Sequence, residues 1–192
     1  MLLSLPEYDV MVMEDVMIPA RDGIRLATDI YRPAKNGALV LNPLPIILQR
    51  TPYNKRNQEA IERNCRYFAR RGYIFAIQDC RACFGSEGEF GYFWQEGPDG
   101  YDTIEWLASQ PWSNGKIGTT GTSYAGWAQV ALAAYNPPHL VCMWVNEGPS
   151  NGYTSSLRHG GALEIRFLTW LLWHAANNTN ATLKKDAAVD EA

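Results

Sequence analysis

The segment Gly118–Gly126 reads Gly-Thr-Thr-Gly-Thr-Ser-Tyr-Ala-Gly and is the most informative part of this sequence. A short strand is expected before it and an Ala-rich helix after it, so the chain must turn sharply at Ser123. Gly121 and Ala125 lie two positions on either side, and their small size lets the backbone close up while the serine Oγ stays exposed. The following helix supplies N–H groups and a positive dipole where an oxyanion would form. The segment therefore predicts a nucleophilic serine.

The alternative for Ser123 is a serine in a glycine-rich turn, such as a phosphate-binding nest of backbone N–H groups. The motif is G-x-S-x-A rather than the strict G-x-S-x-G, so the motif alone leaves both interpretations open. Its position after the fifth expected strand favours the nucleophile.

Short apolar runs alternate with amphipathic segments on both sides of this turn. Near the N-terminus, two alternating runs flank Asp22-Gly23, which indicates an antiparallel hairpin, and residues 33–45 with three prolines are expected to form a loop. The wholly apolar runs are typical of strands buried on both faces of a parallel sheet. The fold predicted is α/β, a mostly parallel sheet with right-handed crossovers. Strands are expected over residues 45–50, 73–77, 116–120 and 140–145, and helices over 57–71, 99–109 and 124–135.

The composition changes after Gly148. Residues 151–161 are polar and rich in glycine, residues 163–176 form a strong helix candidate, and residues 177–192 are polar. We therefore expect one unit over residues 1–148 and a second segment over residues 149–192.

Composition and charge exclude several functional classes. A chain of 192 residues with 46% hydrophobic and 19% charged residues is expected to form one globular domain. The 17 basic and 20 acidic side chains argue against a nucleic-acid-binding protein, which needs clustered Lys and Arg. No apolar run approaches the roughly 20 residues of a membrane span, and the N-terminus lacks a cationic region. We expect a cytoplasmic protein without a membrane partner.

Cys80 and Cys83 form a C-x-x-C pair, which is the one sign of redox or metal chemistry. A redox pair would place the first cysteine at the start of a helix, but a loop follows here, and a zinc site would need a second pair of ligands. We expect reduced cysteines and neither a cofactor nor a metal.

Five motifs in order along the chain resemble one family, the cocaine esterase-like and X-Pro dipeptidyl-peptidase-like (CocE/NonD) serine hydrolases. This family includes α-amino acid ester hydrolases and some β-lactam acylases. Ala82 stands where the family pattern has glycine. The motifs are a hairpin over residues 20–33, Arg50-Thr51-Pro52-Tyr53-Asn54-Lys55, the D-x-R-A-x-x-x-S-E-G-E-F segment over residues 79–90, Trp112–Gly118, and Gly121–Gly126 as a G-x-S-Y-x-G turn.

The resemblance implies an α/β-hydrolase fold and a role for three residues. Ser123 is the implied nucleophile. The phenol of Tyr53 and the backbone N–H of Tyr124 are the implied oxyanion-hole donors. Asp79 and Arg81 are expected to form a buried structural pair, and Trp127 is expected in the core.

The acid and the base of a catalytic triad are not evident in this sequence. In this family a helical cap precedes both, and residues 160–176 resemble the start of that cap. We therefore expect the sheet to lack its C-terminal strands and the triad Asp and His to lie beyond residue 192. His139 is expected at the opposite end of the sheet from Ser123, and His159 and His174 in the cap. Asp186, Asp190 and Glu191 lie in the polar tail.

Two functions remain open from the sequence. The first is a serine hydrolase that cleaves small-molecule esters or amides, including X-Pro dipeptides or α-amino acid esters, through an acyl-enzyme on Ser123. The second is a catalytically incomplete fragment of such an enzyme. The oligomeric state, monomer or homo-oligomer, is left open.

Overall fold

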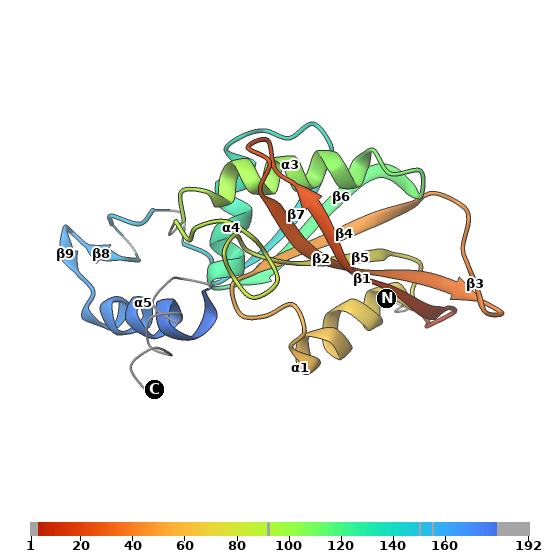
Figure 1. Ribbon diagram of the computed structural model, residues 1–192, viewed down its shortest axis with the longest axis horizontal. Coiled ribbons are helices and arrows are strands. Elements are labelled where there is room, and N and C mark those ends of the chain that lie inside the picture. Colours follow the sequence, from red (N-terminus) through yellow and green to blue (C-terminus); the bar gives the residue numbers. More distant parts are fainter. Residues whose placement is uncertain (1–3, 92, 150, 155, 180–192) are drawn as a thin grey trace, which may run out of the picture.

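A mixed β-sheet organises the chain in a computed structural model, which describes residues 4–91, 93–149, 151–154 and 156–179. The strand order is β1-β2-β5-β4-β6-β7, and β3 pairs with β2 (Figure 1). β1, β2 and β5 pair antiparallel, whereas β5, β4, β6 and β7 run parallel. The strands are β1 (Asp9–Pro19), β2 (Arg25–Lys35), β3 (Ala38–Leu39), β4 (Leu44–Thr51), β5 (Ile74–Asp79), β6 (Ser113–Thr122) and β7 (Leu140–Asn146).

Helices cover both faces of this sheet. α3 (Glu96–Ala108) and α4 (Tyr124–Ala133) lie over one face, and a helix made of α1 (Gln58–Ala60), η1 (Ile61–Arg66) and α2 (Tyr67–Ala69) lies over the other (Figure 1). A small hairpin and a last helix lie beyond the ends of the parallel strands. They are β8 (Arg158–His159), β9 (Ala162–Leu163) and α5 (Ile165–Asn178).

The expected order of strands and helices is confirmed, and two details were wrong. Residues 33–45 are not simply a loop, because β2 continues to Lys35 and pairs with β3 across Asn36-Gly37, both with positive φ. Asn-Gly is a favoured two-residue hairpin turn, a signal hidden among the prolines. The helix expected over residues 57–71 is present, but its middle, η1, is a π-helix. The expected division after residue 148 stays a prediction.

The core consists of two apolar layers, one on each face of the sheet. All six residues of β5 are buried, which explains why the strand begins as an apolar run before the polar Gln78 and Asp79 at its end. The layer under α3 and α4 contains Ile30, Leu48, Ile74, Ile104 and Leu132, among others. The opposite layer contains Tyr31, Ile61, Cys65, Phe75 and Ile77.

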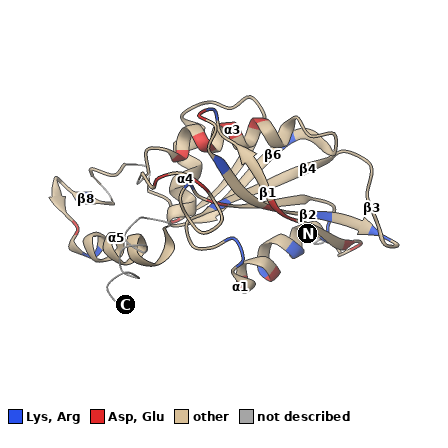
Figure 2. Cartoon of the chain, viewed as in Figure 1, with Lys and Arg blue, Asp and Glu red and all other residues tan. Residues whose placement is uncertain are grey.

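Acidic and basic side chains are both spread over the described chain, with both signs on β2 and only acidic ones on β1 and α3 (Figure 2). Within the described ranges, no helix is both long and apolar enough to cross a membrane.

A buried ion pair ties the N-terminal hairpin to the loop after β4. The side chains of Lys55 and Asp29 are each 2% exposed, and Lys55 Nζ lies 2.8 Å from Asp29 Oδ1. Asp29 also accepts a hydrogen bond of 2.8 Å from the backbone N–H of Asp15, where β1 bulges and φ is positive. Since a charge cannot be buried cheaply without its partner, this pair fixes the position of the loop that carries Lys55.

Asp29→Ala removes the buried partner of Lys55, which keeps only the half-exposed Asp15 at 2.8 Å, and is expected to lower the free energy of unfolding by about 3 kcal/mol, the lower end for a broken buried pair. Urea denaturation measures this loss. The control is Glu59→Ala, which removes the exposed partner of Arg63 and is expected to cost less than about 1 kcal/mol. A loss below about 1 kcal/mol for Asp29→Ala would contradict a structural role for the pair.

Candidate active site

Ser123 lies at a strained turn between β6 and α4. Its backbone has φ 59° and ψ −118°, a conformation that costs a non-glycine residue about 1–3 kcal/mol, and its side chain is exposed. Its N–H donates to Asn146 O of β7 at 3.0 Å, and its carbonyl accepts from Gly126 N and Trp127 N at 2.9 Å each. Bonds to β7 and α4 therefore hold the serine in this conformation.

The residues around the turn must be small, as the sequence indicates. A Cβ on Gly121 would lie 2.6 Å from the Cβ of Ala125, and one on Gly126 would lie 2.8 Å from the Cα of Gly148. A side chain at Gly121 would push β6 away from α4, and one at Gly126 would push α4 away from the end of β7 and the loop that carries Gly148. The close approach of α4 to both strands thus depends on these glycines.

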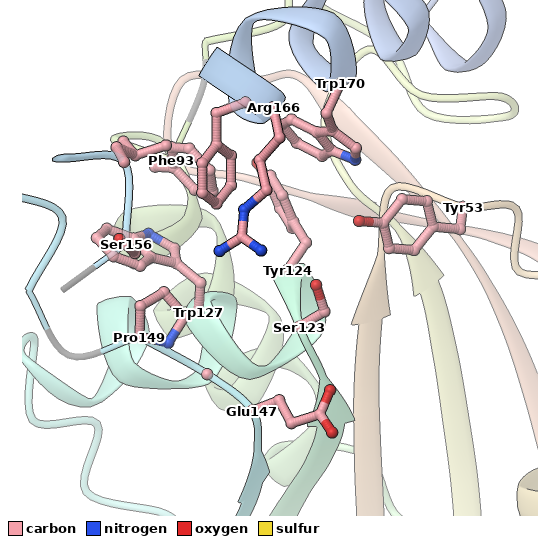
Figure 3. Close-up of a pocket in the computed structure, with 13 residues that line it drawn as sticks. Tyr53, Phe93, Ser123, Tyr124, Trp127, Glu147, Pro149, Ser156, Arg166 and Trp170 are labelled. Atoms are coloured by element: carbon pink, nitrogen blue, oxygen red, sulfur yellow. The ribbon is translucent and has the colours of Figure 1, made fainter. Parts of the chain in front are cut away.

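The phenol of Tyr53 faces Ser123 from the loop after β4 (Figure 3). Burial raises the pKa of Tyr53 above its ordinary value, while hydrogen bonds with Trp170 and Ser123 lower it. At neutral pH the phenol is therefore a neutral hydrogen-bond donor beside Ser123.

Tyr124 presents its backbone and its side chain to different surroundings. It is the first residue of α4, where backbone N–H groups have no partner within the helix. Its side chain is buried, its ring stacks on Phe93 at 4.9 Å between centroids, and its hydroxyl donates to Glu96 Oε1 at 3.0 Å. Burial, followed by the charge of Glu96, raises the pKa of Tyr124, so the phenol keeps its proton.

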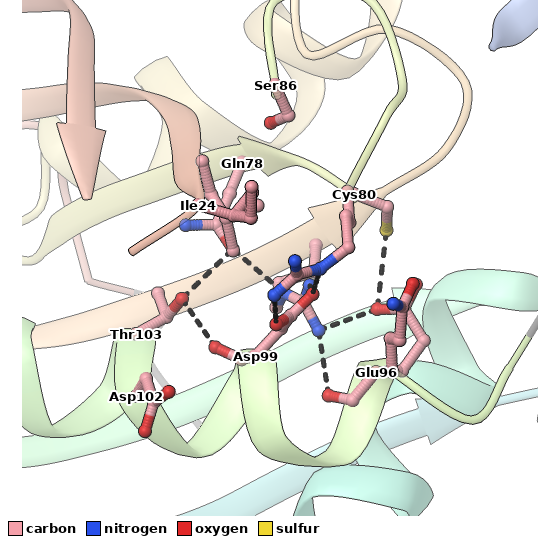
Figure 4. Close-up of polar contacts among 12 residues, drawn as sticks. Ile24, Gln78, Cys80, Ser86, Glu96, Asp99, Asp102 and Thr103 are labelled. Carbon is pink, nitrogen blue, oxygen red and sulfur yellow. Dashed lines mark hydrogen bonds and ion pairs between the residues drawn. The ribbon is translucent and has the colours of Figure 1, made fainter. Parts of the chain in front are cut away.

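A buried polar network joins Tyr124 of α4 to α3, β4 and β5. Figure 4 shows the part of it around Glu96 and Gln78. Glu96 of α3 accepts the Tyr124 hydroxyl on one oxygen and pairs through the other with Arg50 Nη1 of β4 at 2.6 Å. Arg50 Nε donates to Gln78 Oε1 at 2.8 Å, which adds β5. The arginine side chain is fully buried, so the network fixes the start of α4 relative to the sheet.

Asp79 and Arg81 do not pair with each other, contrary to the sequence-based expectation. Arg81 pairs with Asp99 at 2.5 Å and with Asp22 at 2.8 Å. Asp79 instead accepts backbone N–H groups of Lys55 at 2.7 Å and Gly85 at 3.2 Å, and burial raises its pKa to about 6. The carboxylate at the end of β5 thus anchors the loop that carries Tyr53.

The motif around residues 79–90 departs from the family pattern at a position where glycine has a conformational advantage. Ala82 has φ 59°, in the left-handed region that favours glycine. The alanine is tolerated here at some cost in backbone strain.

The C-x-x-C pair does not have the surroundings of a redox site. All four cysteines of the sequence lie in the described residues as free thiols. Burial raises the pKa of Cys80 and Cys83, so both stay protonated, and Cys80 Sγ lies 3.5 Å from Glu96 Oε2. Since the thiolate is the reactive form, these cysteines are packing residues.

An aromatic pocket of about 450 Å³ opens at Ser123 between α4 and α5 (Figure 3). Trp127, expected in the core, is only partly buried and lines this pocket instead. The sequence-based prediction also missed Phe93 and Trp170, because their positions depend on how the loop before α3 and helix α5 fold over Ser123. The lining residues are Tyr53, Phe93, Ser123, Tyr124, Trp127, Glu147, Gly148, Pro149, Ser156, Leu157, Arg166, Phe167 and Trp170.

The three histidines have other partners. His139 precedes β7, at the opposite end of the sheet from Ser123, and pairs with Glu105 at 2.8 Å. His159 of β8 pairs with Glu164 at 2.8 Å. His174 is buried in α5, stacked on Trp170 at 5.0 Å between centroids, and burial lowers its pKa to about 4. The acids of the polar tail, Asp186, Asp190 and Glu191, lie outside the described residues.

Comparison with known protein families identifies the family to which the chain belongs. A sequence profile of the X-Pro dipeptidyl-peptidase (S15 family) matches residues 22–192. The chain belongs to this family. Cocaine esterase from Rhodococcus sp. (strain MB1 Bresler) is 36% identical over 186 residues, which are 94% of this chain and 31% of that enzyme. The chain thus spans about a third of the length of this relative.

Solved structures of relatives have the same fold. A CocE/NonD family hydrolase from Staphylococcus aureus superposes with a TM-score of 0.71 at 28% identity, covering 87% of this chain and 33% of that one. An α-amino acid ester hydrolase superposes with a TM-score of 0.63 at 31% identity, covering 81% of this chain and 28% of that one. The predicted α/β-hydrolase type of fold is confirmed, and the family's relatives are esterases and peptidases.

Protonation of His174 is expected to destabilise the fold. The unfolded chain has an ordinary imidazole pKa near 6.5, whereas the folded value is about 4, so the unfolded state binds more protons between these pH values. The free energy of unfolding therefore falls as pH drops from 6.5 to 4. His174→Phe removes this dependence. The free energy of unfolding of the variant minus that of the wild type should therefore rise as pH drops from 6.5 to 4.

Urea unfolding at pH 7.0, 5.5 and 4.5 measures this difference. The contributions of all other titrating groups cancel in it, because both proteins carry them. Trp170→Phe, which changes the packing on the same ring but leaves the imidazole, should keep the pH dependence of the wild type. A difference between His174→Phe and wild type that is constant with pH would contradict the burial of a neutral imidazole.

Proposed function

We propose that the protein is a serine hydrolase that cleaves esters or amides through an acyl-enzyme on Ser123. The observation that carries the proposal is the strained, exposed Ser123 with the phenol of Tyr53 and the N-terminus of α4 directed at the same pocket. Membership in a family of esterases and peptidases supports it.

In the proposed mechanism, Ser123 Oγ attacks the substrate carbonyl carbon and loses its proton to a general base. The carbonyl π electrons move to its oxygen, which becomes an oxyanion held by the Tyr53 hydroxyl and the Tyr124 N–H. Collapse of this intermediate expels the protonated alcohol or amine and leaves an ester on Ser123, which water then hydrolyses. A neutral phenol suits this role, because it stabilises charge that develops only in the transition state.

The acid and the histidine of the triad are proposed to come from outside the described residues. His139 lies at the opposite end of the sheet from Ser123, His159 does not line the pocket at Ser123, and the low pKa of His174 makes it a weak base.

The substrate is proposed to be a small ester or amide whose class stays open among simple esters, α-amino acid esters and X-Pro peptides. Relatives of each kind are similar to this chain: a cocaine esterase, an α-amino acid ester hydrolase and the family of X-Pro dipeptidyl-peptidases.

The alternative hypothesis is that these 192 residues do not turn over substrate on their own. The exposed apolar side chains of β7 favour it, since Val141 and Trp144 are 58% and 73% exposed at a sheet edge, where apolar residues usually pair or pack. The two hypotheses differ in whether Ser123 is activated in this chain.

Ser123→Ala is expected to abolish covalent labelling by a fluorophosphonate probe, which the wild-type protein that includes the triad histidine should take up at one probe per chain. Intact-protein mass spectrometry measures the stoichiometry. Ser109→Ala, at an exposed serine after α3, is the matched control and should label like the wild type. A folded wild-type chain that neither labels nor hydrolyses p-nitrophenyl acetate would contradict the active enzyme and favour the alternative.

Tyr53→Phe is expected to lower kcat about 100–1,000-fold and to change KM little, because the phenol is proposed to bind the oxyanion and not the ground state. Steady-state hydrolysis of p-nitrophenyl acetate measures both constants. Tyr73→Phe, at a partly exposed tyrosine before β5, is the matched control and should leave kcat unchanged. A kcat for Tyr53→Phe within about threefold of wild type would exclude Tyr53 from the oxyanion hole.

A further inference from the structure

Two buried hydrogen-bond donors belong to residues that line the pocket. The indole Nε1 of Trp127 and the hydroxyl of Ser156 are buried and make no hydrogen bond with any described residue. Both residues line the pocket at Ser123, on the side opposite Tyr53 in Figure 3. Buried polar groups in folded proteins are normally paired, so two donors left unpaired in one pocket are available to an acceptor that binds there.

A cation extends into the same pocket from α5. The guanidinium of Arg166 points down from the helix toward the space between Trp127 and Tyr124 (Figure 3). Its side chain is 73% exposed, so a ligand can reach it, and its Cζ lies 5.7 Å from the centroid of the Phe167 ring. The pocket therefore combines apolar walls with one cation and two neutral donors.

Two carboxylates are relevant to the charge of this site. Glu164 Oε1 lies 3.2 Å from Arg166 Nε, while its other oxygen pairs with His159. The Nη atoms of Arg166 make no ion pair with the described residues, and they are the atoms that face the pocket in Figure 3. Glu147 also lines the pocket, but its carboxylate points away from the guanidinium (Figure 3). With a single cation, the pocket suits a monoanion better than a dianion.

We propose that this pocket selects substrates that carry a carboxylate on the part that lies among the aromatic side chains, with Arg166 as counter-ion and Trp127 and Ser156 as hydrogen-bond donors. A carboxylate is planar and accepts several hydrogen bonds, which matches a guanidinium together with two neutral donors. A volume of about 450 Å³ accommodates an aromatic or short aliphatic group bearing this anion. The proposal names the substrate class of the hydrolase proposed above and rests on that function.

The test compares two aromatic esters of the same shape, monomethyl terephthalate and its uncharged analogue methyl 4-carbamoylbenzoate. Binding is measured by ligand-observed NMR titration to the full chain with Ser123→Ala, so that neither ester is hydrolysed. We expect the carboxylate to bind at least about tenfold more tightly than the amide, which is the lower end of what a charge-assisted hydrogen bond contributes. This preference should weaken at high salt.

Arg166→Gln in the same background is expected to reduce the ratio of the two affinities to about one, and Arg166→Lys to keep part of it. Ser156→Ala and Trp127→Phe should each lower the affinity for the carboxylate severalfold and that for the amide less, because a neutral amide oxygen is the weaker acceptor. Arg158→Gln is the matched control, because Arg158 is an exposed arginine that donates to Gly161 O and does not line the pocket. It should keep the full ratio.

Equal affinities for the two esters, a ratio that Arg166→Gln leaves unchanged, or no saturable binding of either ester would each overturn the proposal. Because binding does not require Ser123, these results are independent of the fluorophosphonate labelling, which tests the nucleophile alone.

Discussion

Ser123 has a backbone conformation that no neighbouring residue of β6 or α4 shares, and the site depends on the contacts that enforce it. The turn is held by a hydrogen bond to β7, by two bonds within the start of α4, and by the contact of Gly121 with Ala125. Local strain of about 1–3 kcal/mol persists only where the surroundings over-determine it. Here the surroundings are the carboxyl ends of parallel strands, where loops and a helix N-terminus converge.

Buried charges hold the residues that face Ser123. Lys55, two residues after Tyr53, is tied through its side chain to Asp29 and through its backbone N–H to Asp79. Tyr124 is tied through Glu96 to Arg50. Such pairs contribute little net stability compared with apolar packing, but removing one partner is costly. Their effect is to specify where two loops lie, which a catalytic site requires more than additional stability.

The sequence predicted the parts of this molecule whose signals are local. Buried apolar runs identified the strands, the Asp-Gly turn identified the hairpin, and small residues around Ser123 identified the sharp turn. The partners of Arg81 were predicted incorrectly, because Asp99 and Asp22 are distant in the sequence and nothing in its pattern distinguishes them from Asp79. The aromatic pocket was missed for the same reason: Phe93, Trp127 and Trp170 come together only when α5 packs over the loop before α3. The buried donors of Trp127 and Ser156, which are unpaired among the described residues, can be recognised only from the three-dimensional structure.

The central claim is that Tyr53 and the start of α4 face an oxyanion formed on Ser123. A crystal structure of the protein after reaction with an alkyl phosphonate tests it most directly, because the phosphonyl oxygen occupies the position of the oxyanion. The account predicts phosphorus bonded to Ser123 Oγ, with the phosphonyl oxygen about 2.7–3.1 Å from both Tyr53 Oη and Tyr124 N. A phosphonyl oxygen directed away from both donors, or phosphorus bonded to another residue, would contradict it.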